Sequence, residues 1–333
     1  MNDSLYGTRD KRGNYTPNEA LEIAPIYAMP PRPLRVLKWL FGPDGYLFPW
    51  NVALFVASAV TWFFLTPSME VMATLTPGWI TYILLRNMAM VLVLFGLFHL
   101  RLYIRKRQGN TFKYNPKFPE PKGQSSFILG SQTRENMFWT FCFGIPIWSA
   151  YEVLFLWAFA SGRLPILEFA QSPAWFVGFF FLIPLWRELH FYVIHRLIHW
   201  GPLYHWIHKV HHNNVNPGPW SSLSMHPVEH LLYFSVTLIH VVIPSHPLHF
   251  LYTLQHAGLG SIVGHIGFDK VVTGEDKAMD THAYTHYLHH KFFEVNYGDG
   301  TVPLDKVFGT FHDGTKAGDR KMDERRHARL NKQ

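Results

Sequence analysis

The chain has 333 residues, of which 48 % are hydrophobic and 16 % are charged, and its formal net charge is +7. Soluble domains carry about 25 % charged residues, so this composition argues against an ordinary soluble protein and favours a membrane protein. The single cysteine, Cys142, excludes an internal disulfide framework and a cysteine-based metal site. The polar start of the chain, Met1–Tyr15, has no apolar core of the kind found in signal peptides, so no cleavable signal is expected.

Long windows with few charges predict an all-α polytopic membrane protein with about four transmembrane helices. The expected spans are Gly45–Met69, Trp79–Tyr103, Phe138–Ala160 and Phe169–Trp186. The second span contains Arg86 and the third contains Glu152, and each of these must snorkel or face protein. The fourth span is expected to continue into a polar turn that carries histidines.

A further apolar stretch, Leu231–Phe268, contains no Asp, Glu, Lys or Arg and is broken at Pro244. Each half is short for a full span, so a re-entrant or interfacial helical hairpin is expected. We expect a lipid to reach the site between this hairpin and the fourth span.

Lysine and arginine are unevenly distributed, and this predicts the orientation. They are concentrated in the N-terminal region and in the loop 103–136, whereas the short connections 70–78 and 161–168 hold only Arg163. The positive-inside rule therefore puts the N-terminus, that loop and everything after the fourth span in the cytoplasm. A basic loop beside a membrane needs no nucleic acid to explain it, so none is expected as a partner.

The 21 histidines are strongly clustered, because 18 of them lie between His190 and His290. Two HxxHH clusters and one HxxxH pair stand out: His208, His211 and His212; His286, His289 and His290; and His195 and His199. Residues three and four apart share one side of a helix, so several imidazoles should point in a common direction. Neutral imidazole is a good ligand for iron, zinc, copper or nickel.

The number of histidines limits the kind of site. One zinc ion takes four ligands, so eight imidazoles indicate two metal ions. The HExxH motif of zinc proteases is absent, and a single cysteine argues against iron–sulfur clusters. A histidine-rich metal transporter or a haem electron carrier remain as alternatives of a different class, although both would place histidines inside the spans.

The histidine motifs resemble those of the fatty acid hydroxylase and sterol desaturase superfamily. The resemblance rests on HFYVIHRLIHW (190–200), HWIHKVHH (205–212), MHPVEH (225–230), GHIGFD (264–269), HYLHH (286–290), NYG (296–298) and LDKVFGT (304–310). It extends over about residues 138–312.

This resemblance implies a non-haem di-iron site, with O2 as co-substrate and an external electron donor. By position it assigns as metal ligands His195, His199, His208, His211, His212, His265, His286, His289 and His290. Some relatives have a second histidine four residues after the one matched by His265, where this chain has Asp269. The ligand shell therefore has further candidates, each a ligand or a hydrogen-bond partner of one: His190, His226, His230, His282, Asp269, Glu188 and Glu229. No catalytic side chain is expected beyond the metal centre.

The predicted organisation is a cytoplasmic N-terminal segment (1–46), a transmembrane hairpin with a basic loop (47–137), a hydroxylase/desaturase-like catalytic domain (138–312) and a polar tail (313–333). The histidines should form a helical cap on the cytoplasmic side of the endoplasmic reticulum or of a bacterial inner membrane. The predicted function is O2-dependent hydroxylation or desaturation of a bilayer lipid, with a sterol as first choice. Fatty-acyl, alkylglycerol or carotenoid hydroxylation are the alternatives. Electrons would come from cytochrome b5 or a ferredoxin-type reductase chain.

Overall fold

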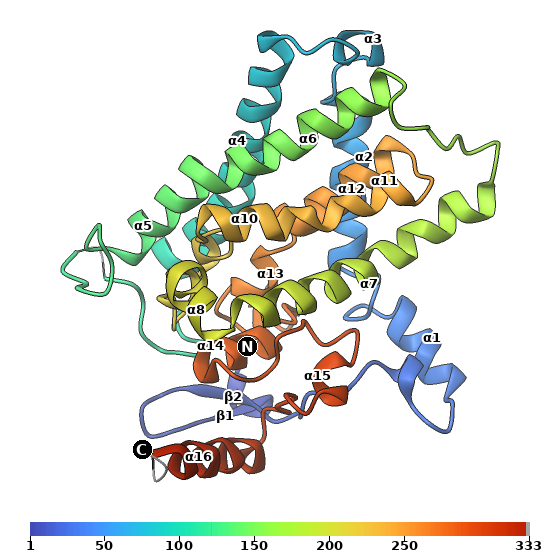
Figure 1. Ribbon diagram of the computed structural model, residues 1–333. Coiled ribbons are helices and arrows are strands. Elements are labelled where there is room, and N and C mark those ends of the chain that lie inside the picture. The colour runs from blue at the N-terminus through green and yellow to red at the C-terminus, as the bar shows by residue number, and fades with distance from the viewer. Residues whose placement is uncertain (121, 331–333) are drawn as a thin grey trace.

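The computed structural model describes residues 1–120 and 122–330, and these residues are mostly helical (Figure 1). The predicted all-α class is confirmed, with two short antiparallel hairpins added to it. In the first, β1 (Gly7–Arg9) pairs with β2 (Tyr15–Pro17), with Thr8 opposite Thr16. In the second, β3 (Lys270–Val272) pairs with β4 (Ala278–Asp280), with Val271 opposite Met279.

Three helices are long and apolar enough to cross a membrane. The first is α4 (Pro77–His99), continued by a π-helical turn, η3 (Leu100–Ile104). The second joins α5 (Gln132–Trp139), the π-helical turn η4 (Thr140–Gly144) and α6 (Ile145–Ala160). The third is α7 (Pro173–Ile198). They correspond to the second, third and fourth predicted spans.

The first predicted span is wrong in its length. Helix α2 covers only Trp50–Phe64, which is 15 residues. At about 1.5 Å per residue it is shorter than a hydrocarbon core of about 30 Å. The charge-free window was longer than the helix because Pro49 precedes its first turn and Pro67 follows its end.

Helix α7 extends well beyond the predicted fourth span. It contains Pro184 and remains helical as far as Ile198, so His195 lies inside the helix and His199 caps it. The polar turn expected after Trp186 is therefore wrong. Because of this extension, α7 runs from the apolar region directly into the histidine site.

The apolar stretch 231–268 does form a hairpin of short helices. One arm is α10 (Pro227–Phe234), the turn η7 (Ser235–Leu238) and α11 (Ile239–Val242), and the other is α12 (Pro247–Gly258). Most of α12 is buried, and it packs against α2, α6 and α7. Contacts between α12 and α7 close part of the boundary between the hairpin and the fourth span, and a lipid path there stays a prediction.

The remaining elements, apart from α3, lie towards the end of the molecule that carries the histidines (Figure 1). They are η1 (Asp3–Leu5), η2 (Pro25–Tyr27), α1 (Pro33–Phe41), α3 (Met69–Met72), α8 (Gly201–Leu203), η5 (Tyr204–His208), α9 (Lys209–His212), η6 (Pro219–Ser221), α13 (Ile262–His265), α14 (Tyr284–Phe292), α15 (Leu304–Val307) and α16 (Lys316–Leu330), of which only α3 lies at the opposite end. A small core formed by Tyr15, Phe112, Tyr114, Tyr284 and Tyr287 fixes the N-terminal hairpin to α14.

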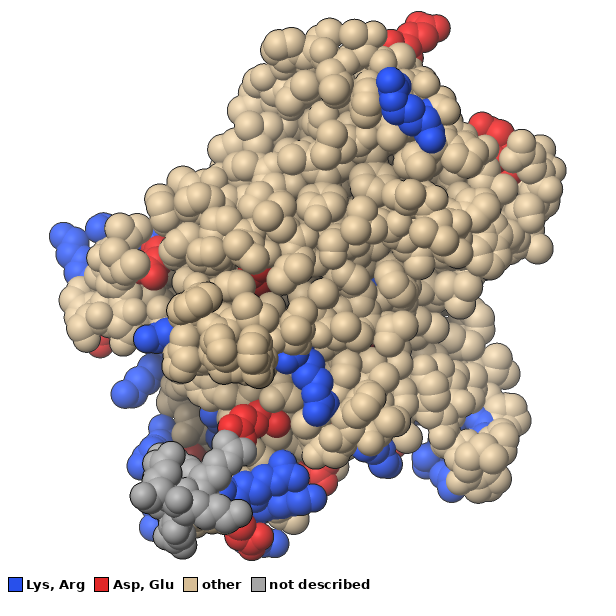
Figure 2. Space-filling model, viewed as in Figure 1, with Lys and Arg blue, Asp and Glu red and all other residues tan. Residues whose placement is uncertain are grey.

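Charged side chains avoid the middle of the molecule. Figure 2 shows Lys, Arg, Asp and Glu side chains mainly around the end that carries α14, α15 and α16, with only a few at the opposite end. Large apolar side chains are exposed on the long helices between these ends, among them Phe63, Leu85, Val93 and Val193. An exposed apolar belt of this kind is what a helical protein presents to a bilayer.

Arg86 and Glu152, the two charges inside predicted spans, form an ion pair with each other. Both are buried, and Asn87 Nδ2 also donates to Glu152 Oε2 over 2.8 Å. Arg86 Nη1 donates to the carbonyl oxygen of Leu65, at the end of α2, over 3.0 Å. One buried network thus connects α2, α4 and α6.

Candidate metal centre

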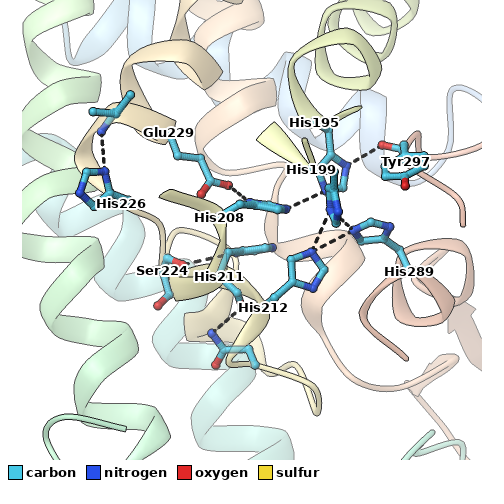
Figure 3. A network of polar contacts seen from close by, with 12 residues as sticks. His195, His199, His208, His211, His212, Ser224, His226, Glu229, His289 and Tyr297 are labelled. Carbon is cyan, nitrogen blue, oxygen red and sulfur yellow. Dashed lines mark hydrogen bonds and ion pairs between the residues drawn. The ribbon is translucent and has the colours of Figure 1, made fainter. Parts of the chain in front are cut away.

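The nine histidines assigned as ligands lie together in two groups. The five-histidine group is formed by His195, His199, His208, His212 and His289, and the four-histidine group by His211, His265, His286 and His290. Within each group the nearest ring nitrogens all lie within 4.8 Å of one another. Figure 3 shows the imidazoles of the five-histidine group pointing towards one another from α7, η5, α9 and α14.

Each HxxHH cluster is divided between the two groups. In α14, His286 and His290 belong to the four-histidine group, whereas His289 belongs to the five-histidine group. Positions i and i+4 are about 40° apart around a helix, but neighbouring residues are about 100° apart, so adjacent histidines face different centres. His211 and His212 diverge in the same way. The two clusters therefore serve both groups at once.

Backbone carbonyls fix the orientation of several of these rings through Nδ1. The Nδ1 atoms of His195, His265 and His289 lie 2.7, 2.9 and 2.7 Å from the carbonyl oxygens of Tyr297, Ser261 and Val295. Since a carbonyl oxygen only accepts, Nδ1 carries the proton, and Nε2 of the neutral ring keeps its lone pair. This is the arrangement found in metal-bound histidines.

The bare nitrogens then face one another. His211 Nδ1 lies 3.4 Å from the carbonyl oxygen of Ser224, so His211, like His265, has an unprotonated Nε2. These two Nε2 atoms are 3.2 Å apart with no proton between them. Burial lowers the pKa of His211 well below its usual value and that of His265 to about 4, so a neutral pair is expected. Two converging lone pairs repel each other unless a cation lies between them.

The spacing within the five-histidine group also fits a metal ion. The Nε2 atoms of His199, His212 and His289 are mutually 3.1 Å apart. Three nitrogen ligands at right angles and about 2.1 Å from one metal ion lie about 3.0 Å from one another. A separation of 3.1 Å leaves no space for a porphyrin between the rings, which argues against the haem alternative.

The candidate ligands include the carboxylates of Glu188, Glu229 and Asp269. Among the described residues, Glu229 is the one of these three that contacts a histidine of either group. Its Oε1 lies 2.8 Å from His208 Nδ1 (Figure 3). Burial raises the pKa of Glu229 well above its usual value and lowers that of His208. A cation bound on the Nε2 side of His208 would offset the cost of burying this carboxylate.

The loop formed by residues 297–301, after α14, is held in place by charged side chains that do not contact the histidine rings of the two groups. Glu188 accepts hydrogen bonds from the backbone N–H groups of Gly300 and Thr301, at 2.7 and 3.1 Å. Arg187 forms an ion pair with Asp299. Asp305 accepts from the N–H groups of Tyr297 and Gly298. Together these contacts position the Tyr297 carbonyl that receives the proton of His195.

The other candidates lie outside both groups. His190 contacts Ser235 Oγ, and His226 caps α10 by accepting from the N–H of Val228. His230 is buried against Gly144. His282 is partly exposed beside Asp280, 3.3 Å away. Asp269 accepts from the Tyr114 hydroxyl at 3.2 Å, and burial raises its pKa to about 7. The positions of these five residues do not support a role as metal ligands.

A cavity of about 690 Å³ adjoins the histidines. Both groups reach it, through His195, His208, His211, His265 and His286. Its other walls come from α2 (Trp50, Leu54), from α7 (Pro184, Phe191), from α10 (Tyr233) and from the N-terminal segment 17–25. This volume lies in the usual range of ligand sites, about 300–1,000 Å³.

The contacts made by backbone carbonyls were not predicted from the sequence, because every residue has a carbonyl. Asp299 and Arg187 were also missed as a pair, since 112 positions separate them. The motif NYG (296–298) was a usable signal for this loop, and it was noted only as part of the resemblance.

The fold and the paired histidine groups define a helical membrane protein with a candidate site for two metal ions. Residues 180–310 match the fatty acid hydroxylase family, which confirms the resemblance found in the motifs.

Among known proteins, the chain is similar to fungal sterol desaturases. It is 31 % identical over 159 residues to a Delta(7)-sterol 5(6)-desaturase of Aspergillus fumigatus, covering 41 % of this chain and 49 % of the relative. Identity to the Delta(7)-sterol 5(6)-desaturase of Saccharomyces cerevisiae is 28 % over 121 residues, covering 36 % and 32 %. A probable Delta(7)-sterol 5(6)-desaturase of Neurospora crassa is 25 % identical over 177 residues, covering 51 % and 49 %. The chain thus spans about half the length of these relatives or less, and no solved structure matches it.

Proposed function

We propose that this protein is a membrane-embedded oxidoreductase that holds two iron ions and uses O2 to hydroxylate or desaturate a lipid. The observation that carries the proposal is the convergence of nine imidazoles in two groups, with bare Nε2 atoms as close as 3.1 Å. All-imidazole groups of this kind suit iron, copper, nickel or zinc, and similarity to the fatty acid hydroxylase family favours iron.

A sterol is the first candidate substrate, because the relatives described above carry the name sterol desaturase. Fatty-acyl, alkylglycerol and carotenoid substrates are alternatives within the same chemistry. The cavity of about 690 Å³ supports a lipid-sized substrate, since it brings apolar walls from α2 and α7 up to both histidine groups.

When bound, the iron pair would supply the oxidising power to break an unactivated C–H bond with O2. The protein's own residues would place the lipid and exclude water. Hydroxylation consumes one O2, two electrons and two protons and yields an alcohol and one water, whereas desaturation yields an alkene and two waters. The carbonyls of Tyr297, Ser261 and Val295 keep the protons of three histidines on Nδ1, so that Nε2 stays free for the metal.

We place the site on the cytoplasmic side of the endoplasmic reticulum or of a bacterial inner membrane, in accord with the positive-inside rule. The two electrons would come from a separate carrier, such as cytochrome b5 or a ferredoxin with its reductase.

Product analysis tests this function. The iron-loaded protein is supplied with a reductase chain, a Delta(7)-sterol and a panel of other lipids under ¹⁸O2. We expect one lipid to gain an ¹⁸O-labelled hydroxyl group or to lose two hydrogen atoms, and the His208→Ala variant to give no product. An iron-loaded and reducible protein that converts no lipid in the panel would contradict the proposal.

A further inference from the structure

The outer edge of the five-histidine group is framed by three aromatic rings. His199 is the one member of this group that is partly exposed, and its ring lies 5.6 Å from that of Tyr204 and 4.9 Å from that of Tyr297. The ring of Phe293 lies 4.7 Å from that of His212. Phe293 holds this place with a φ of +68°, which bulky side chains rarely adopt and which local contacts must stabilise.

Three exposed cations directly follow histidines of the site in the sequence. The guanidinium of Arg196 lies 5.6 Å from the ring centre of Tyr297. The backbone N–H of Lys209 bonds to the carbonyl of Tyr204 across the π-helical turn η5, so Lys209 stands one turn after Tyr204. Lys291 Nζ lies 4.5 Å from the ring centre of Phe292, the residue before Phe293. Arg196, Lys209 and Lys291, here called the cationic collar, each directly follow a buried histidine of the site.

Acidic groups near the collar offset this charge only in part. Asp319 lies 3.6 Å from Lys291, and both side chains are well exposed. Burial and, to a smaller extent, the charge of Glu294 raise the pKa of Tyr297, whereas Arg196 acts in the opposite direction. An exposed pair such as Lys291 and Asp319 contributes about 0–1 kcal/mol, so a partner's carboxylate can replace Asp319 at small cost.

The collar lies at the part of the site that the cavity does not reach. His195, His208, His211, His265 and His286 line the cavity, whereas His199, Tyr204, Phe293 and Tyr297 do not. A lipid in the cavity would therefore leave the His199 edge open. This gives the site one approach through the cavity, whose walls include both apolar and charged side chains, and a second approach at the His199 edge.

We propose that the cationic collar is the docking surface for an acidic one-electron carrier protein, whose redox group comes to rest against the edge formed by His199 and Tyr297. The inference rests on the proposed function, because it assumes a redox-active metal pair. In each encounter the carrier is oxidised by one electron and the metal pair is reduced by one, so two encounters supply the two electrons. Oppositely charged surfaces raise association rates between proteins by about 10–10³-fold, and salt weakens this effect.

Binding of two soluble probes tests the surface independently of turnover. The haem domain of cytochrome b5 and an acidic [2Fe–2S] ferredoxin are titrated onto the iron-loaded protein in neutral detergent at low and at high salt. The Lys209→Glu/Lys291→Glu variant is compared with Arg105→Glu/Arg107→Glu, in which two exposed cations of the 103–136 loop are reversed. Both variants change the net charge equally.

We expect the collar variant to bind the preferred carrier about tenfold or more weakly at low salt, with little difference at high salt, and the loop variant to bind nearly as wild type. Equal losses in both variants, or no loss in the collar variant, would overturn the inference. No loss of carrier binding in the collar variant is also the result expected if the collar contacts anionic lipid headgroups instead. Iron content and reduction by dithionite are measured on each sample, because loss of iron in the wild type would point to failure of the proposed function itself.

Discussion

At the residue scale, the Nδ1 partners of the histidines decide what their Nε2 atoms can do. Carbonyl oxygens of Tyr297, Ser261 and Val295 each hold one imidazole proton away from the site. Glu229 faces His208 in the same position, but with a carboxylate. A negative group behind a ligand makes its other nitrogen more basic and attracts a cation more strongly.

Replacement of Glu229 by alanine should therefore weaken metal binding at the five-histidine group. Loss of such a hydrogen-bond partner typically lowers metal affinity about 10–100-fold. The measurement is competition with a chelator, followed by metal analysis. Glu229→Gln should lose less, because its amide oxygen still accepts from His208 Nδ1, and His190→Ala, outside both groups, should behave as wild type. Equal affinity of Glu229→Ala and wild type would show that Glu229 does not act on the metal.

At the element scale, the buried network of Arg86 and Glu152 fixes the packing of α4 against α6. Glu152 also accepts from Asn87 in α4, and Arg86 reaches the last turn of α2 through the Leu65 carbonyl. The C-terminal end of α2 is thereby fixed at the end of the molecule opposite the histidines. Both charges are almost fully buried, so neither can turn to water if its partner is removed.

Glu152→Ala should destabilise the protein by about 3–5 kcal/mol, because it leaves the Arg86 guanidinium buried without its counter-charge. Thermal unfolding in detergent gives the change. The double variant Arg86→Leu/Glu152→Leu should recover much of the loss, since it buries no charge. A single variant as stable as the wild type would mean that solvent or lipid headgroups reach Arg86.

Some of the helices and site histidines were predictable from the sequence, and others were not. The spacing of HxxHH and HxxxH was sufficient to select eight of the nine histidines that the structure gathers, because helical periodicity is a local property, whereas His265 was selected through the family resemblance. Which histidines of different clusters combine into one group was not predictable, because that depends on contacts between distant helices. Windows with few charges located three long helices, but they overestimated α2, where Pro49 and Pro67 set the limits.

At the scale of the whole molecule, the site lies between an apolar belt and a charged end (Figure 2). The long helix α7 connects the two, with exposed Val193 on its surface and buried His195 within the site. The cavity is lined by α2 and the N-terminal segment, and none of the three residues of the cationic collar lines it. On the two proposals above, a lipid substrate and an electron carrier would reach the metal centre by different routes.

The metal content of the purified protein tests the central claim most directly. Mass spectrometry of detergent-purified and iron-reconstituted samples should give close to two irons per chain. His289→Ala and His286→Ala, which remove one ligand from each group, should each lower that number, whereas His190→Ala should not. One metal ion per chain, or a content that does not depend on His286 and His289, would contradict a paired iron centre.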